Sequence, residues 1–322
     1  MIGSGPNHGA WLMSVLSCFV RIPEPHIGGP APWATVGPVL RSPELLDRVG
    51  GLVAGLLDDA AVFPPGDATV PAAVAAHLDH RRAWYADLVG PLLVRASQVA
   101  ELVAAAPPGA DLRVGLVADT GLAGLAEGGA RLLDQDDRAE LAQVEIALPA
   151  GHDPGAAAKV LVDQLAMSAT AYVEVPRSGY EGALDVLADD GAERAKYRTG
   201  GLVPEAFPGE DELAGFLLAC LERALPFKLT AGLHHALRCT VGGLEQHGFL
   251  NVLAAVEAGR RGATPDELAR LLGRRDADPL VEVLAAADVA AVRSAFVSFG
   301  CCGVTDPVDD LVALGLLAAD AP

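Results

Sequence analysis

The sequence predicts a (β/α)8 TIM-type barrel, the α/β fold in which eight parallel strands close into a cylinder inside a ring of helices. Two observations lead to this prediction. Short, mostly continuous apolar runs recur from Leu56 onward, as expected of parallel strands that are buried on both faces. Longer segments with helical spacing alternate with them, which gives eight β-then-α units in series. A doubly wound open sheet is the alternative, because a strand count from one sequence can be wrong.

Apolar character places the strands along the chain. The predicted strands are Leu57–Phe63, Pro91–Arg95, Leu112–Ala118, Gln143–Leu148, Thr170–Val175, Arg194–Arg198, Pro226–Thr230 and Ala295–Phe299. In a barrel of this kind the carboxyl ends of these strands form the active-site face. We therefore look for functional residues at those ends.

Several predicted helices carry their own start signals. Pro71 stands at a first-turn position, and acidic residues open Asp211–Arg223, which suits the helix dipole. Thr264 to Glu267 reads Thr-Pro-Asp-Glu, a capping start. The predicted helices are Pro71–Leu88, Gln98–Ala105, Gly121–Leu133, Pro154–Met167, Tyr180–Asp189, Asp211–Arg223, then Leu244–Ala258, Thr264–Leu272 and Leu280–Ala287 in an elaborated seventh βα connection, and a closing helix Pro307–Leu317.

Length and composition indicate one folded domain. The chain has 322 residues, of which 51% are hydrophobic and 20% charged, so disorder of the whole chain is excluded. Residues 1–40 are rich in Pro and Gly, and we expect an N-terminal extension whose order is left open. Residues 41–322 are predicted to form a single barrel domain.

The net charge and the cysteines indicate which classes of partner and which cellular compartment to expect. Acidic residues number 42 and basic residues 23, for a net charge of −19, which repels nucleic acid and anionic membranes. The apolar run Trp11–Val20 is half the length of a membrane span, and it lacks a positively charged leader because the first basic residue, Arg21, follows it. The five cysteines form no Cys-x-x-Cys pair, which favours reduced thiols in a cytoplasmic protein. A homo-oligomer is compatible with the sequence.

The lysines are the most informative residues. Among the 23 basic residues only Lys159, Lys196 and Lys228 are lysines, and an amine can lose its proton and act as a nucleophile, whereas guanidinium cannot. Lys196 and Arg198 are two apart and share one strand face, as do Lys228 and Thr230. Two ammonium groups that converge inside a barrel repel each other, so we expect one lysine pKa to fall. A lysine with a lowered pKa is prepared for imine formation.

Other polar residues at the strand ends complete the candidate site. His234 or His235 can act as acid or base or contact the substrate. No His-x-His or His-Glu-x-x-His spacing is present, so we expect neither a metal nor a cofactor. The candidate catalytic residues are Lys196, Lys228, His234, His235, Glu174 and Asp119, and the candidate substrate-binding residues are Arg198, Thr199, Thr230, Arg95, Asn251, Gly300 and Cys301.

Three of these residues have two interpretations each. Asn251 lies four residues after His247 on one helix face, where it either caps the site or packs the helix. Cys301 and Cys302 either pack a small-residue turn or provide a nucleophile. The turn from Gly300 can also present backbone N–H groups to a phosphate.

The lysine motifs resemble those of the deoxyribose-phosphate aldolase group. Lys196-Tyr-Arg-Thr-Gly200 is similar to the sixth-strand Lys-x-x-Thr-Gly of that group, and Lys228-Leu-Thr-Ala-Gly232 is similar to its seventh-strand Lys-x-x-x-Gly. The resemblance implies that Lys196 forms an imine, that Lys228 perturbs its pKa, and that Asp119, or Glu145 or Glu174 in its place, relays protons. Arg198 departs from that pattern by replacing a small hydroxyl residue, and the two histidines stand where a Gly-rich phosphate-binding turn is expected.

A broader resemblance covers most of the chain after residue 50. Asp59-Ala-Ala-Val-Phe-Pro-Pro, His247-Gly-Phe-Leu-Asn and Ser298-Phe-Gly-Cys-Cys, together with both lysine motifs, are similar to an uncharacterised bacterial protein family. This resemblance implies no activity. The leading hypothesis is thus a class I aldolase-type lyase that acts on a small anionic carbonyl metabolite. The alternatives are a metal-independent isomerase, decarboxylase or transferase with a Lys/Arg/His anion clamp, and a non-catalytic ligand-binding barrel.

Overall fold

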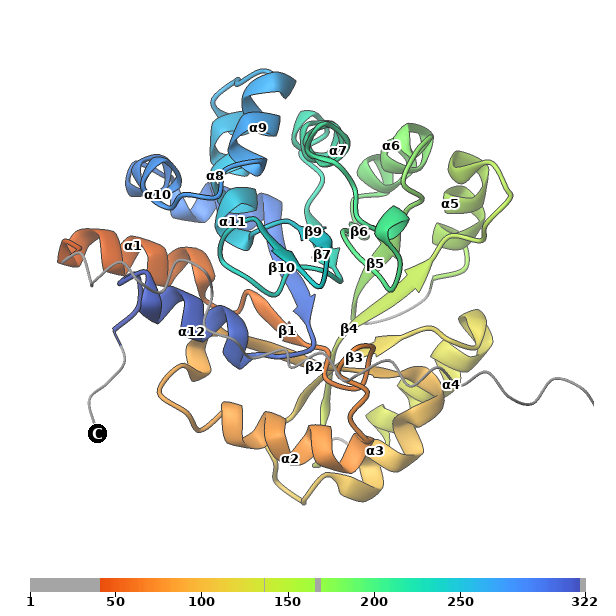
Figure 1. The fold of residues 1–322 in the computed structure, drawn as a ribbon. Helices are drawn as coiled ribbons and strands as arrows, with labels where there is room; N and C mark the ends of the chain where they lie inside the picture. The colour runs from red at the N-terminus through yellow and green to blue at the C-terminus, as the bar shows by residue number, and fades with distance from the viewer. Residues whose placement is uncertain (1–40, 136, 166–168, 319–322) are drawn as a thin grey trace, which may run out of the picture.

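Eight parallel strands close into a barrel at the centre of the molecule (Figure 1). The structure is a computed structural model that describes residues 41–135, 137–165 and 169–318. The barrel strands are β1 (Leu57–Asp59), β2 (Val89–Arg95), β3 (Arg113–Val117), β4 (Glu140–Ala147), β5 (Thr170–Glu174), β6 (Arg194–Arg198), β7 (Phe227–Thr230) and β10 (Phe296–Cys301). Their order around the barrel is β1-β10-β7-β6-β5-β4-β3-β2. The predicted (β/α)8 fold is confirmed.

Helices surround the barrel, as Figure 1 shows. Four of them, α1, α2, α5 and α9, have Pro within their first two residues and a preceding Ser, Thr or Asp side chain that caps the backbone. The helices are α1 (Pro43–Val53), α2 (Val70–His80), α3 (Val99–Ala105), α4 (Gly121–Leu133), α5 (Pro154–Val162), α6 (Glu181–Asp190), α7 (Glu210–Glu222), α8 (Phe249–Arg260), α9 (Pro265–Leu272), α10 (Asp278–Ala285), α11 (Val289–Ala295) and α12 (Thr305–Ala313). Short 3-10 turns are η1 (Ala86–Leu88), η2 (Ala96–Gln98) and η3 (Pro204–Ala206).

Some predicted boundaries are wrong. The first strand ends at Asp59 instead of Phe63, because the Asp59 side chain accepts a hydrogen bond from the Ala61 N–H at 3.1 Å and the chain turns there. The predicted helix Pro71–Leu88 is two elements, α2 and η1. The predicted helix Pro154–Met167 ends at Val162 in the structure. Its predicted last residue, Met167, lies outside the described residues, as does the predicted extension 1–40.

The seventh connection is elaborated as predicted but begins differently. The predicted helix Leu244–Ala258 does not begin at Leu244, because Leu244–Gln246 is instead strand β9. β9 forms an antiparallel hairpin with β8 (Cys239–Val241). Gly242 and Gly243 make its two-residue turn with φ of 58° and 81°, values that glycine adopts without strain. Helices α8 to α11 then follow before the last barrel strand.

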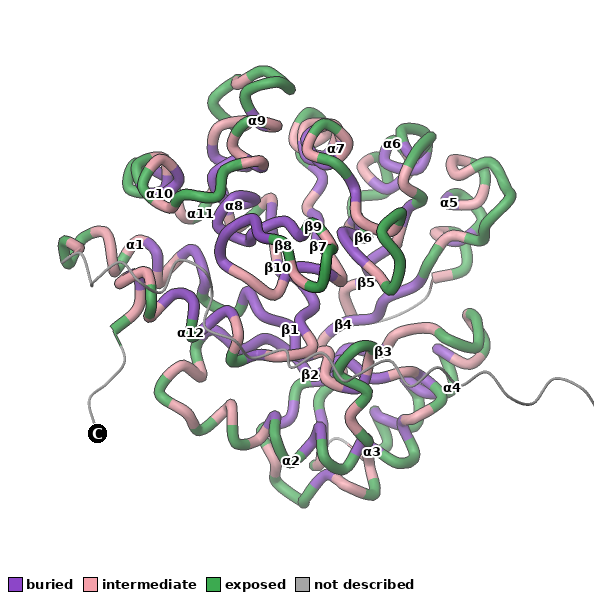
Figure 2. The backbone as a smooth tube through the Cα atoms, in the orientation of Figure 1, coloured by how far each residue is buried: buried purple, intermediate pink, exposed green. Residues whose placement is uncertain are grey.

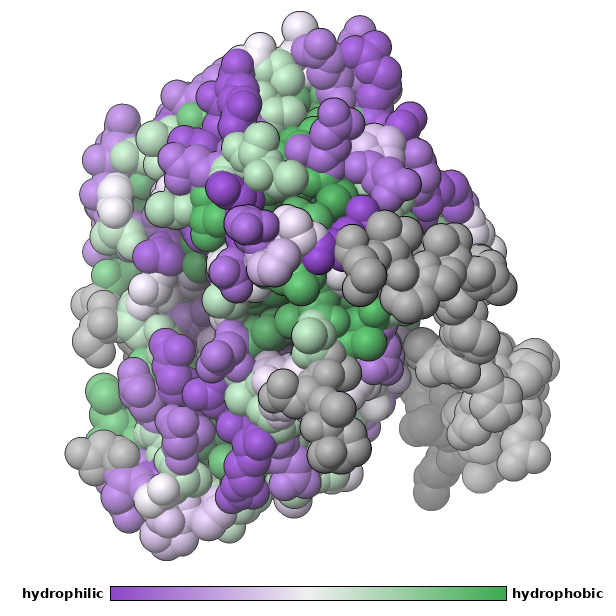
Figure 3. Space-filling view, turned by 90° about the vertical axis from the view of Figure 1, so that its left-hand side faces the viewer, coloured by the Kyte–Doolittle hydropathy of each residue, from purple (hydrophilic) through white to green (hydrophobic). Residues whose placement is uncertain are grey.

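The core lies between the strands and the helices, where Figure 2 shows buried backbone. Aromatic rings from β6, α7, β7 and β10 pack against one another in sequence there. Tyr197 lies 4.3 Å from Phe216 between ring centroids, and Phe227 lies 5.5 Å from Phe296. Figure 3 shows polar side chains over much of one outer face, with apolar side chains between them. In the described part of the chain, no helix combines the length and apolar character that a bilayer crossing requires.

Candidate functional site

A line of alternating positive and negative side chains runs through the barrel interior. Register explains part of it, because Lys196 on β6 pairs with Lys228 on β7 on one side and with Glu174 on β5 on the other. Side chains in register on neighbouring strands point to the same face of a sheet. We name this line the charged column, and its members in order are Asp58, Lys228, Glu145, Lys196, Glu174 and Arg198.

The inner end of the charged column is closed to solvent. Lys228 Nζ donates hydrogen bonds to Asp58 Oδ2 and to Glu145 Oε1, and these three side chains are at most 1% exposed. Gln143 Nε2 donates to Asp58 Oδ2 at 3.0 Å and to Glu145 Oε1 at 3.2 Å. Ser298 Oγ donates to Asp58 Oδ2 at 2.9 Å. The buried carboxylates are therefore satisfied by amine, amide and hydroxyl donors, as buried charges require.

The outer end of the column opens toward solvent. Lys196 Nζ lies 2.6 Å from Glu145 Oε2 and 2.9 Å from Glu174 Oε2. Arg198 Nε donates to Glu174 Oε1 at 2.9 Å. Side-chain exposure rises along this path from 5% for Lys196 to 15% for Glu174 and 46% for Arg198.

Ion pairing dominates the protonation of the column. Burial favours the neutral form of Glu145, but the charges of Lys196 and Lys228 outweigh it and lower its pKa to about 2. Burial likewise opposes ionisation of Glu174, and Lys196 and Arg198 lower its pKa. Burial also disfavours the Lys228 ammonium, yet Asp58 and Glu145 raise the pKa of Lys228 above its usual range. Lys228 is therefore not the lysine whose pKa falls, because a carboxylate stands between the two amines and offsets their repulsion.

The two predicted histidines follow β7 but belong to other clusters. His234 Nδ1 lies 3.5 Å from Cys301 Sγ and 3.8 Å from Cys302 Sγ. Burial, together with the charge of His235, lowers the pKa of His234 to about 4. His235 Nδ1 lies 3.2 Å from Asp310 Oδ2, which raises the pKa of His235. The structure thus pairs the histidines with residues of β10 and α12.

Cys301, at the end of β10, and Cys302, directly after it, are held as thiols. Cys301 Sγ donates to the Gly303 carbonyl at 3.2 Å, and burial raises the pKa of Cys301. Burial also raises the pKa of Cys302 to about 11. These environments favour the packing interpretation of the pair over a nucleophile. Gly300 is buried in β10 in register with Thr230, and the phosphate-binding turn stays a prediction.

Asp119 does not join the lysines. Its carboxylate accepts hydrogen bonds from the Ser97 hydroxyl and, at 3.1 Å, from the Ser97 N–H. Glu145 and Glu174, the substitutes considered for the proton relay, are the carboxylates that contact Lys196.

Three predicted substrate-binding residues are already engaged. Asn251 is fully buried, accepts from the Arg238 N–H at 3.0 Å and donates to two carbonyls of the α9–α10 segment at 2.8 Å, which favours helix packing. The buried Thr199 hydroxyl donates to the carbonyls of Thr230 and Ala231. Arg95 stacks over Phe63 with its guanidinium carbon 4.7 Å from the ring centroid.

Asp58, Gln143 and Ser298 belong to the hydrogen-bond network of the charged column but are absent from the predicted site. Gln143 and Glu145 are two apart on β4 and share one face, and such a polar pair in an apolar run is a usable signal. The contact between Asp58 and Ser298 cannot be read from a local pattern, because the closure of β10 against β1 brings them together.

Within the described residues, no group of three or more His, Cys, Asp or Glu side chains is arranged to hold a metal ion.

Comparison with known proteins assigns neither a family nor a function to the chain. No family model matches the chain, and searches of curated proteins and of solved structures find no match either. The resemblance to the aldolase group therefore rests on the lysine motifs themselves.

Proposed function

We propose that this protein is a lyase of the class I aldolase type, in which Lys196 forms an imine with a small anionic carbonyl compound. The observation that carries the proposal is the position of the Lys196 amine between the closed and the open halves of the charged column. A carboxylate lies on each side of it, at 2.6 and 2.9 Å. A nucleophilic amine needs such a proton acceptor beside it.

A gain in folding stability does not explain why the side chains of the charged column are buried. Replacing a buried ion pair with well-packed apolar side chains is often neutral or stabilising. Here the amines of Lys228 and Lys196 and the carboxylates of Asp58 and Glu145 are buried where other barrels place apolar side chains. Lys228 is fully compensated by its two carboxylates, so it holds Glu145 ionised and in place. This role needs no contact between Lys228 and the substrate.

The proposed reaction starts with a proton transfer from the Lys196 ammonium to Glu174, the carboxylate nearer to solvent. The free amine adds to the carbonyl carbon, the carbonyl oxygen takes one proton from Glu174 and a second from the amine nitrogen, and water leaves, which yields a protonated imine. Glu174, again a carboxylate, accepts the proton of the substrate hydroxyl beyond the scissile bond. The carbon–carbon bond breaks, its electron pair moves toward the imine nitrogen, and an aldehyde departs. Protonation of the resulting enamine and addition of water release the second product and restore Lys196.

Arg198 is the residue that leads us to propose an anionic substrate. Its guanidinium is the most exposed cation of the column, and Glu174 binds it on one side. A guanidinium offers several N–H donors, so a substrate carboxylate or phosphate can share Arg198 with Glu174. The anion clamp alternative would need uncompensated positive charge, whereas each of the three column cations has a carboxylate partner.

Borohydride trapping tests the proposal. The full chain is incubated with pyruvate, acetaldehyde, dihydroxyacetone phosphate or glyceraldehyde 3-phosphate, reduced, weighed by intact mass spectrometry and mapped by peptide. We expect a stable adduct on the peptide that contains Lys196, and its loss in Lys196→Arg.

The chain offers a matched control in Lys159, which is exposed on α5. Lys159→Arg should keep the adduct. If the mass increase maps elsewhere, persists in Lys196→Arg or is absent with every carbonyl compound, Lys196 is not an imine-forming lysine. In that case the clamp is the better interpretation of the column.

A further inference from the structure

A pocket lies far along the chain from the charged column, in the elaborated seventh connection. Its walls are the end of α8, the turn that joins α8 to α9, α9 itself and α10, and it is an open pocket of about 700 Å³. Sites for small molecules are commonly of this size. These helices are additions to the plain βα repeat, so the barrel does not need them for closure.

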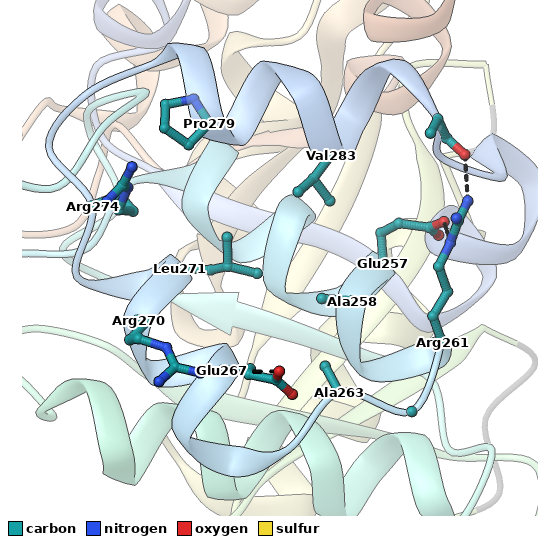
Figure 4. Close-up of a pocket in the computed structure, with 12 residues that line it drawn as sticks. Glu257, Ala258, Arg261, Ala263, Glu267, Arg270, Leu271, Arg274, Pro279 and Val283 are labelled. Carbon is teal, nitrogen blue, oxygen red and sulfur yellow. Dashed lines mark hydrogen bonds and ion pairs between the residues drawn. The ribbon is translucent and has the colours of Figure 1, made fainter.

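The pocket has an apolar middle and charged ends. Leu271 and Val283 lie near its centre in Figure 4, with Arg270 and Arg274 on one side. On the other side Arg261 pairs with Glu257, whose side chain is 2% exposed.

The carboxylates that line the pocket already accept hydrogen bonds from other groups of the protein. Glu257 accepts from the guanidiniums of Arg260 and Arg261. Glu267 Oε2 accepts from the Thr264 N–H at 2.8 Å and from its hydroxyl at 2.9 Å, as the start of α9 requires. Neither carboxylate is therefore poised to receive a cationic ligand.

The arginines Arg270 and Arg274 are held by weaker ion pairs than these carboxylates. Arg270 is 72% exposed in its side chain, and its ion pair with Glu267 is 4.0 Å long. Arg274 pairs with Asp276 at 3.2 Å, where both side chains are about half exposed or more. Exposed pairs of this kind contribute little and exchange readily for another anion.

We propose that this pocket binds a small amphipathic carboxylate, with the carboxylate between Arg270 and Arg274 and the apolar body on Leu271 and Val283. Charge complementarity supports this occupant. The whole chain carries −19, so a site for an anion needs a local group of arginines, and three line this pocket. The apolar middle favours a carboxylate with a hydrocarbon chain over inorganic phosphate.

Isothermal titration of the full chain with sodium decanoate, below its micellar concentration, tests the proposal. We expect saturable binding that weakens by about tenfold or more in the double variant Arg270→Gln/Arg274→Gln, since charge-assisted hydrogen bonds to the carboxylate are lost. Arg82→Gln is the matched control, because Arg82 is exposed at the end of α2 and pairs with Asp79. It should leave decanoate binding unchanged.

Two further probes separate the contributions of charge and chain. Decylamine and inorganic phosphate should each bind more weakly than decanoate, because the first has the wrong charge and the second lacks the chain. Equal binding of decanoate to the wild type and the double variant overturns the proposal. So does the absence of saturable binding, or tighter binding of either other probe. Both arginines are exposed, so the variants test binding without disturbing the core.

Discussion

Lys196 and Lys228 are register partners on β6 and β7, and both amines reach the same carboxylate, Glu145. Two lysines on neighbouring strands would otherwise place like charges side by side in a dry interior. Glu145 divides its two oxygens between them, with Oε2 to Lys196 and Oε1 to Lys228. Glu145 therefore holds both lysine amines of the charged column in place.

Glu145→Gln is expected to destabilise the fold. The substitution keeps the shape of the side chain but removes the charge shared by two buried ammonium groups, and loss of one partner of a buried pair costs about 3–5 kcal/mol. The free energy of unfolding, from urea denaturation followed by circular dichroism, measures this. Glu101→Gln on the exposed face of α3 is the control, with an expected change within about 0.5 kcal/mol. Equal stability of the two variants would mean that Glu145 is not bound as described.

Acidification should weaken the wild type through the same residue. The pKa of Glu145 is about 2 in the folded protein and near 4.5 when unperturbed, so its contribution is fully present above about pH 4.5 and is lost as the pH falls toward 2. Over that window the stability of Glu145→Gln should fall less steeply, by at most about 1.4 kcal/mol per pH unit. Parallel slopes for the two proteins would show that Glu145 has an ordinary pKa.

The barrel could be predicted because its evidence is local. Apolar runs and helical spacing are read within a few residues, and all eight predicted strands overlap observed ones. The β8–β9 hairpin was missed because its strands are three residues each, and the apolar residues from Leu244 onward match a helical pattern equally well. Helix α1 was also missed, although Ser42 caps it and Pro43 begins it.

The site could be predicted only in part, because the closure of the barrel decides which side chains become neighbours. Lys196, Lys228, Glu174 and Arg198 were predicted from strand ends and lie in the charged column. No local pattern shows that β1 and β4 reach across to Lys228, so the sequence neither identifies Asp58 as its partner nor separates Asp119 from the lysines. The neighbours of His234 and His235 could not be predicted for the same reason, since the course of the loop after β7 sets them.

His235 should titrate above its ordinary pKa as long as Asp310 is ionised. The raised pKa means that the pair stabilises the fold below about pH 6.5 and that this contribution is lost as the pH rises through the folded pKa. Asp310→Asn should bring the pKa of His235 down toward 6.5, measured by NMR titration of the imidazole C–H signals. The neighbouring Asp309, exposed on α12, provides the control Asp309→Asn. An unmoved His235 titration in Asp310→Asn would contradict the pairing.

Cys302 should alkylate slowly in the native protein. Its pKa of about 11, against an ordinary value of 9.0, lowers the thiolate fraction near neutral pH about a hundredfold, and the thiolate is the reactive form. His234 cannot correct this, because an imidazole with a pKa of about 4 does not hold a proton taken from such a thiol. Iodoacetamide labelling followed by peptide mass spectrometry should therefore give a Cys302 rate about a hundredfold below that of N-acetylcysteine, with Cys301 slower still. Labelling in urea should restore both rates. A native Cys302 rate at or above that of the free thiol would instead identify an activated nucleophile beside His234.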